Sequence, residues 1–89
     1  MELRFDTTMR SVSFRHKKSE RLTLTELLIF AHIACQPATV GTLLDRFWQR
    51  PDERQTATLQ MHISNLRKKI QPLELDLKKR DDKYMLLRS

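Results

Sequence analysis

A run of apolar residues in the second half of the chain is spaced for one face of a helix. Four of them follow one another at steps of four, three and four residues: Leu59, Ile63, Leu66 and Ile70. At 100° per residue this spacing brings all four onto one side, and a proline two residues later ends the pattern. The spacing therefore predicts an α-helix over 56–70 that buries this side against a core.

The opposite side of this predicted helix is polar and basic. On or beside it lie the candidate contact residues Gln60, Met61, His62, Ser64, Asn65, Arg67 and Lys68. No Asp or Glu occurs between Ala57 and Leu73, although the chain holds 11 acidic residues. Amide side chains can hydrogen-bond base edges, and Arg or Lys can reach guanine or phosphate, so this side favours DNA contact. A solvated basic helix face is the alternative interpretation.

Two shorter helices are predicted upstream. Thr23 and Glu26 have the Thr-x-x-Glu spacing of a capping box, in which each side chain bonds the backbone amide of the other. A helix is therefore expected over 24–35, ended by the proline that follows it. Thr39 is a second residue of the N-cap type, and the apolar residues after it predict a helix over 39–48.

Strand patterns occupy both ends of the chain. Apolar residues alternate with charged ones within 1–22 and predict short strands, whereas 49–55 is polar and is expected to be a loop. Leucines alternate with charged residues over 73–87, which predicts a β-hairpin. Because the chain has one glycine, turns that need a positive φ must use Asp, Asn or strained backbone, and Asp81-Asp82 is the candidate.

Together these elements predict an α+β fold, a winged helix-turn-helix forming a single domain over 1–89. A small N-terminal antiparallel sheet precedes three helices, and a C-terminal hairpin forms the wing. An 89-residue chain can bury one small core, which leaves little room for a deep substrate cavity.

The charge balance favours an anionic partner. Lys and Arg number 17 against 11 Asp and Glu, giving a net charge of +6. For a basic domain of this kind, nucleic acid is a more probable partner than a membrane surface. Basic residues also gather at the predicted hairpin turn, where Arg80 could enter a minor groove. A solvated turn fits the same pattern equally well.

Nothing in the sequence indicates catalysis, a metal site or a cofactor. His16, His32 and His62 lack the i, i+4 spacing of helical metal ligands. We expect His32 to be partly buried and hydrogen-bonded, and Cys35 to pack near the end of its helix. The single cysteine suits a reducing compartment, and no apolar run is long enough to span a bilayer. The chain is thus expected to be a cytoplasmic protein that is not an enzyme.

Three segments together resemble a known family. They are 23–30, then Leu43-Leu44 through Phe47-Trp48, and most specifically Thr58–Ile70, which reads TLQMHISNLRKKI. These resemble the OmpR/PhoB-type output domain of response regulators. The resemblance implies that the 56–70 helix is the recognition helix in the major groove. Carried over by position, it places base or backbone contacts at Gln60, His62, Ser64, Asn65, Arg67 and, in the wing, Arg80.

The resemblance also implies partners. These are double-stranded DNA at the nucleoid, a second copy bound in tandem on direct repeats, and RNA polymerase through the 48–58 segment. The chain departs from the family pattern: Gln60 replaces the usual acid, Ser64 and Asn65 replace the usual arginines, and the wing lacks its glycines. Base preference should therefore differ. The alternative class is a protein-interaction winged helix, an adaptor or antagonist of a regulator with weak or no DNA binding.

Overall fold

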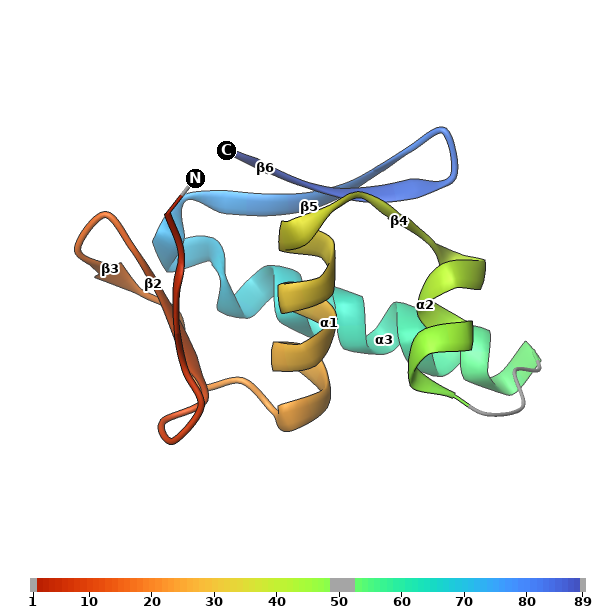
Figure 1. Cartoon of the computed structure of the whole chain (residues 1–89), viewed down its shortest axis with the longest axis horizontal. Coiled ribbons are helices and arrows are strands. Elements are labelled where there is room, and N and C mark those ends of the chain that lie inside the picture. Colours follow the sequence, from red (N-terminus) through yellow and green to blue (C-terminus); the bar gives the residue numbers. More distant parts are fainter. Residues whose placement is uncertain (1, 49–52, 89) are drawn as a thin grey trace.

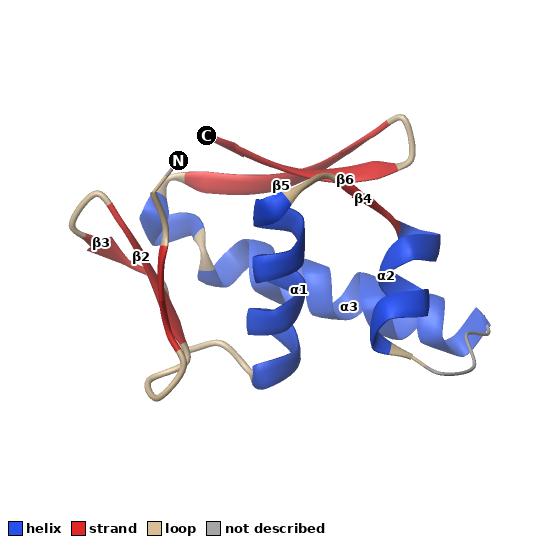
Figure 2. Cartoon of the chain, in the orientation of Figure 1, coloured by secondary structure: helices blue, strands red, loops and turns tan. Residues whose placement is uncertain are grey.

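Three α-helices and two small antiparallel sheets make up the part of the chain that the structure describes, residues 2–48 and 53–88; one sheet lies to the left of the helices and the other above them (Figures 1 and 2). This computed structural model has the predicted α+β winged-helix architecture. The helices are α1 (Leu24–Cys35), α2 (Val40–Phe47), α3 (Glu53–Lys69) and a short 3-10 helix, η1 (Gln71–Leu73). The strands are β1 (Arg4–Asp6), β2 (Ser11–Phe14), β3 (Lys17–Lys18), β4 (Ala38–Thr39), β5 (Leu75–Arg80) and β6 (Lys83–Arg88).

Side-chain caps determine where α1 and α2 begin. Thr23 Oγ1 accepts a hydrogen bond from the Glu26 amide at 3.1 Å, and Glu26 Oε1 accepts one from the Thr23 amide at 2.7 Å. Both bonds of the capping box are therefore present, and α1 has its predicted bounds. Thr39 caps α2 by accepting from the Thr42 amide at 3.0 Å. As a cap it lies outside α2, which is one residue shorter at each end than predicted.

The bounds predicted for α3 are wrong at both ends. The helix begins at Glu53, three residues before the predicted start. Its first turn is polar, so no apolar periodicity marks this start in the sequence. The predicted loop therefore does not include 53–55, and 49–52 lie outside the described residues. The helix ends at Lys69, and η1 follows. Leu73 lies in η1, so the hairpin predicted over 73–87 runs instead from Leu75 to Arg88.

The apolar side of α3 is buried as its spacing predicted. Leu59, Leu66 and Ile70 are fully inaccessible to solvent, and Ile63 is 3% exposed. This side packs against α1 and α2, behind which α3 passes in Figure 1. Burying one side against two helices fixes the rotation of α3 about its axis and leaves its polar side facing outward.

The C-terminal sheet has the strand order β4-β6-β5. Arg80 pairs with Lys83, so Asp81 and Asp82 form a two-residue turn. Their φ angles are 50° and 64°, as the single-glycine argument predicted for this turn. The two-residue strand β4 was not predicted; it pairs Ala38 with Tyr84 and joins the helices to the wing.

The N-terminal sheet has the order β1-β2-β3 and lies at the left of Figure 1, beside α1. It closes with a tight turn at Arg15 and His16, whose φ angles of 52° and 66° are also positive. No helix among the described residues is long and apolar enough to cross a membrane.

Candidate nucleic-acid interface

The outward side of α3 brings together most of the predicted contact residues. Its exposed members are Gln60, Met61, Ser64, Asn65, Arg67 and Lys68. Met61 is 56% exposed, although it is apolar. Since the apolar side of α3 is buried in the core, these side chains project away from the protein. The outward side offers amides, a hydroxyl and cations, with no carboxylate from its own helix between Ala57 and Lys69.

His62 has a different environment from its neighbours on the helix. It is half-buried, and its ring lies 6.4 Å from that of Trp48, at an interplanar angle of 35°. Phe47 and Trp48 are both half-buried against the core at the end of α2. The structure therefore places His62 at the α2–α3 contact, at the margin of the outward side.

Arg67 forms an ion pair with Asp76, which no sequence pattern predicted. Its Nε lies 3.0 Å from Asp76 Oδ1, and its Nη2 lies 3.5 Å from Asp76 Oδ2. The Arg67 hydrogen bond lowers the pKa of the Asp76 carboxyl, partly opposed by burial, with further lowering by the positive charge of Arg67 and by the Leu77 amide. No local pattern indicates this pair, because its partners lie on different elements.

Lys69 is likewise paired, in this case with a buried carboxylate. Its Nζ lies 2.7 Å from Oε1 of Glu26, which is 1% exposed. Burial raises the pKa of Glu26, but the hydrogen bond from Lys69 and the Thr23 amide outweigh it, so the pKa lies below its usual value. This pair joins the first turn of α1 to the last turn of α3. The Lys69 ammonium is therefore bound to a carboxylate of the protein itself.

The wing carries the second group of cations. Lys78, Lys79, Arg80 and Lys83 are exposed around the turn, and the Lys79 ammonium lies 5.9 Å from the centre of the Tyr84 ring. The predicted contact residue Arg80 ends β5, directly before the two aspartates. An open groove of about 430 Å³ separates the wing from α3, lined by residues that include Gln60, Ser64, Lys78 and Lys79. Amide, hydroxyl and ammonium side chains from α3 and the wing therefore face a common hollow.

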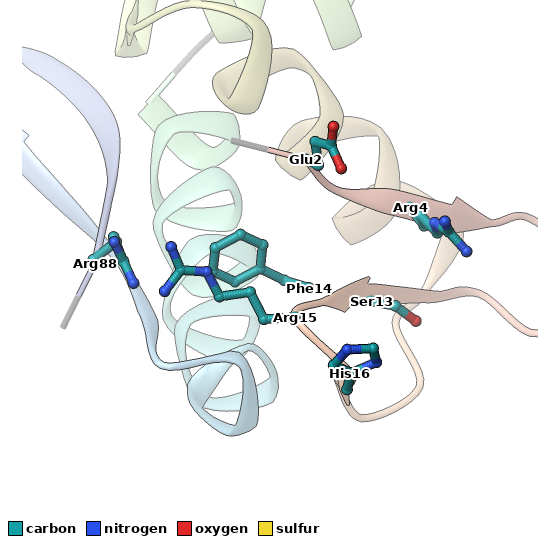
Figure 3. Close-up of a pocket in the computed structure, with 7 residues that line it drawn as sticks. All are labelled: Glu2, Arg4, Ser13, Phe14, Arg15, His16 and Arg88. Carbon is teal, nitrogen blue, oxygen red and sulfur yellow. The ribbon is translucent and has the colours of Figure 1, made fainter.

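A second basic cavity lies away from this surface, at the opposite end of the hairpin from its turn. Figure 3 shows Arg4, Arg15 and Arg88 around it, together with His16 and the carboxylate of Glu2. Its volume is about 800 Å³. The Arg15 guanidinium stacks over the Phe14 ring, 5.2 Å from its centre. None of the predicted contact residues lines this cavity, so it is separate from the α3 surface.

Two expectations about single residues need correction. Cys35 is exposed, because it ends α1 beyond the last buried residue of that helix. His32 is half-buried as predicted, but its buried Nε2 has no hydrogen-bond partner; the ring instead meets Phe47 edge-on at 6.0 Å. Within residues 2–48 and 53–88, no group of three His, Cys, Asp or Glu side chains is placed to hold a metal ion.

An exposed third helix beside a β-hairpin defines the winged helix-turn-helix class of DNA-binding folds. The chain belongs to the family described as transcriptional regulatory protein, C-terminal, whose model matches residues 17–79. This is the OmpR/PhoB-type family that its motifs indicated.

One solved structure similar to the chain is the DNA-binding domain of the response regulator AdeR in complex with an intercistronic region. The two share 28% sequence identity with a TM-score of 0.67, and the match covers 98% of this chain and 95% of that one. No curated protein sequence matches the chain.

Proposed function

We propose that this chain is the DNA-binding domain of a transcription regulator and that α3 is its reading helix. The observation that carries the proposal is the outward side of α3, which is exposed and free of carboxylates over the whole segment that presents Gln60 to Lys68. The major groove of B-DNA is wide enough to admit such a helix. The solved AdeR complex supports the same assignment.

The exposed residues divide into two chemical roles. Gln60 and Asn65 carry amides that match the donor and acceptor pair of adenine in the major groove, and Ser64 can bond several bases. Arg67 and Lys68 lie nearer the end of the helix and suit phosphate contact. In the wing, Arg80 would reach the minor groove, whose negative potential attracts arginine. Met61 contributes apolar contact, and His62 lies at the margin of the contact surface.

The proposal is tested by the salt dependence of binding. If α3 and the wing neutralise about four to six phosphates, the plot of log K against log salt should have a slope of roughly −4 to −5. Fluorescence anisotropy with a random-sequence duplex at several salt concentrations measures this slope. A flat response, or no binding at low salt, would overturn the proposal.

A second candidate function is a protein-interaction winged helix with weak or no DNA binding. Two observations favour it: aspartates occupy the tip of the wing, and Asp76 offsets the charge of Arg67. Both features reduce the positive potential where DNA would lie. The same titration separates the candidates, because an adaptor of this kind would bind the duplex weakly or not at all even at low salt.

Family membership extends the proposal to partners. Two copies would bind direct repeats in tandem, which predicts a stoichiometry of two per duplex and a half-site spacing of about one helical turn. The 48–58 segment would contact RNA polymerase; of this segment, the structure describes Trp48 and the first turns of α3. Such a domain would work in the cytoplasm, at the nucleoid.

A further inference from the structure

The pairing of Arg67 with Asp76 is a side-on fork between α3 and β5. Two N–H groups of the guanidinium, on Nε and Nη2, face the two carboxylate oxygens at 3.0 Å and 3.5 Å. Two parallel contacts of this kind fix the plane of the guanidinium as well as its position. The Arg67 side chain is therefore held in one orientation, although 51% of it is exposed.

Asp76 is itself fixed by the backbone of the wing. Its Oδ1 also accepts a hydrogen bond from the Leu77 amide at 2.8 Å, and only 23% of its side chain is exposed. The flanking residues Leu75 and Leu77 are buried, which anchors this part of β5 in the core. The Leu77 amide and this anchoring of β5 hold the Asp76 carboxylate beside Arg67.

The outer edge of Arg67 remains available. A guanidinium has five N–H donors, and the fork uses two of them, so about three remain. Arg67 lines an open hollow of about 500 Å³ together with Ser64 and Lys68, and also lines the groove between α3 and the wing. The free donors therefore lie on the surface that the proposed function assigns to DNA.

We propose that Asp76 is a specificity-determining residue. It holds Arg67 in the orientation that suits one register on DNA, and it offsets the positive charge of Arg67 when the domain lies in any other register. On a random sequence, binding rests mainly on charge, so the nearby carboxylate weakens the attraction between Arg67 and phosphate. On a selected site the register is fixed, and an arginine already held in place loses little further rotamer freedom. This inference rests on the proposed function of α3.

The test is the variant Asp76→Asn, which keeps the size of the side chain and removes its charge. Its affinity and that of the wild type are measured by fluorescence anisotropy on a duplex selected by the wild type from a random library, and on a scrambled duplex. On the scrambled duplex we expect binding about 2- to 5-fold tighter, and a salt slope steeper by about 0.9. On the selected duplex we expect unchanged or weaker binding, so that discrimination falls.

Two further variants isolate the mechanism. Asp82→Asn makes the same chemical change in the same hairpin, but Asp82 does not contact Arg67, so its discrimination ratio should match that of the wild type. In an Arg67→Gln background, Asp76→Asn should change neither affinity, because the residue acts through Arg67. Circular dichroism checks that every variant retains the native fold.

The outcomes separate this inference from the function on which it rests. If the wild type binds neither duplex, the proposed function fails and the inference fails with it. If the wild type binds and discriminates, but Asp76→Asn behaves like Asp82→Asn, the inference alone is overturned. The same holds if Asp76→Asn retains its full effect when Arg67 has been replaced.

Discussion

Asn65 and Lys68 both project from the outward side of α3, but they offer DNA different interactions. The Asn65 amide has a donor and an acceptor, a pair that matches one base edge and mismatches others. The Lys68 ammonium is a compact charge that any phosphate can accept. Neither residue touches the core, since both are exposed. Replacing them therefore separates base reading from backbone binding without disturbing the fold.

We expect Asn65→Ala to cost about 1–3 kcal/mol of binding free energy on a selected duplex and little on a scrambled one. Lys68→Ala should weaken binding to both duplexes similarly and reduce the magnitude of the salt slope by about one. Paired anisotropy titrations measure both effects. Equal losses on the two duplexes for Asn65→Ala would contradict its assignment as a base reader, and unchanged melting temperatures provide the control for folding.

Periodicity in the sequence predicts which side of α3 is inward, but not which outward cations are free. Leu59, Ile63, Leu66 and Ile70 are buried as their spacing predicted. Arg67 and Lys69, by contrast, bind Asp76 and Glu26, and the second of these partners is 43 residues away in the chain. Such partners depend on how the elements pack, which no local pattern contains.

At the scale of elements, the backbone of α2 contains the single glycine of the chain. Gly41 lies in the first turn of the helix, is exposed, and does not have a positive φ. A methyl group at this position would meet only Thr39 Oγ1, at 3.8 Å, which is an ordinary contact. Glycine at this position therefore loses more conformational entropy on folding than another residue would, although the folded backbone here does not need a glycine.

We therefore expect Gly41→Ala to raise the free energy of unfolding by about 0.5–1 kcal/mol. Urea denaturation at pH 7 measures the change, and the m-value should stay constant if both states keep their compactness. A loss of stability would contradict this account, because it would mean that the added methyl group meets an obstacle.

In the turn between β2 and β3, by contrast, a residue other than glycine has a positive φ. His16 has a φ of 66°, a conformation that costs most side chains roughly 1–2 kcal/mol and costs glycine little. His16→Gly should therefore increase stability, by up to about 1 kcal/mol after the extra unfolded-state entropy is counted. His16→Ala serves as the matched control, since alanine retains the strain. Equal stabilities for the two variants would contradict this explanation.

Local signals explain which elements could be predicted. The capping box of Thr23 and Glu26 placed α1 correctly, because both of its partners lie within one turn. The start of α3 at Glu53 has no comparable signal, since its first turn is polar. Strand β4 has two residues and exists because β6 pairs with it, so its formation depends on tertiary structure.

At the scale of the whole molecule, the Glu26–Lys69 pair connects the beginning of α1 to the end of α3. Lys69 also accepts, through its carbonyl, a hydrogen bond from the Glu20 amide at 3.0 Å. The segment before α1 and the C-terminal end of α3 therefore meet through both backbone and side chains. Because this contact orients α3 relative to the core, the protonation state of the Glu26 carboxyl affects the stability of the whole domain.

The sign of the pH dependence follows from the lowered pKa of Glu26. Burial alone would raise this pKa, but the bonds from Lys69 and the Thr23 amide lower it further than burial raises it. A carboxyl whose pKa is lower in the folded state stabilises folding at pH values above its unfolded pKa, about 4.3. That contribution is lost as the pH falls through the folded value. Asp76, whose pKa is lowered mainly by Arg67, acts in the same direction.

We therefore expect Glu26→Gln to be less stable than the wild type at pH 7 by about 1.5–3 kcal/mol, the usual contribution of hydrogen bonds to a charged group. The difference should shrink as the pH falls below about 4.3, because the wild type then loses the same charge. Glutamine retains the reach of glutamate to the Thr23 amide, so the cap of α1 is preserved.

Urea denaturation between pH 3 and pH 7 measures this convergence, and two lysine variants test its cause. Lys69→Gln should converge on the wild type in the same pH range, since it removes the partner of Glu26. Lys68→Gln removes the same charge one residue earlier, where the side chain is exposed, and should stay within about 0.5 kcal/mol of the wild type throughout. A constant gap between the wild type and Glu26→Gln across this range would mean that the carboxylate charge contributes nothing to the contact between α1 and α3.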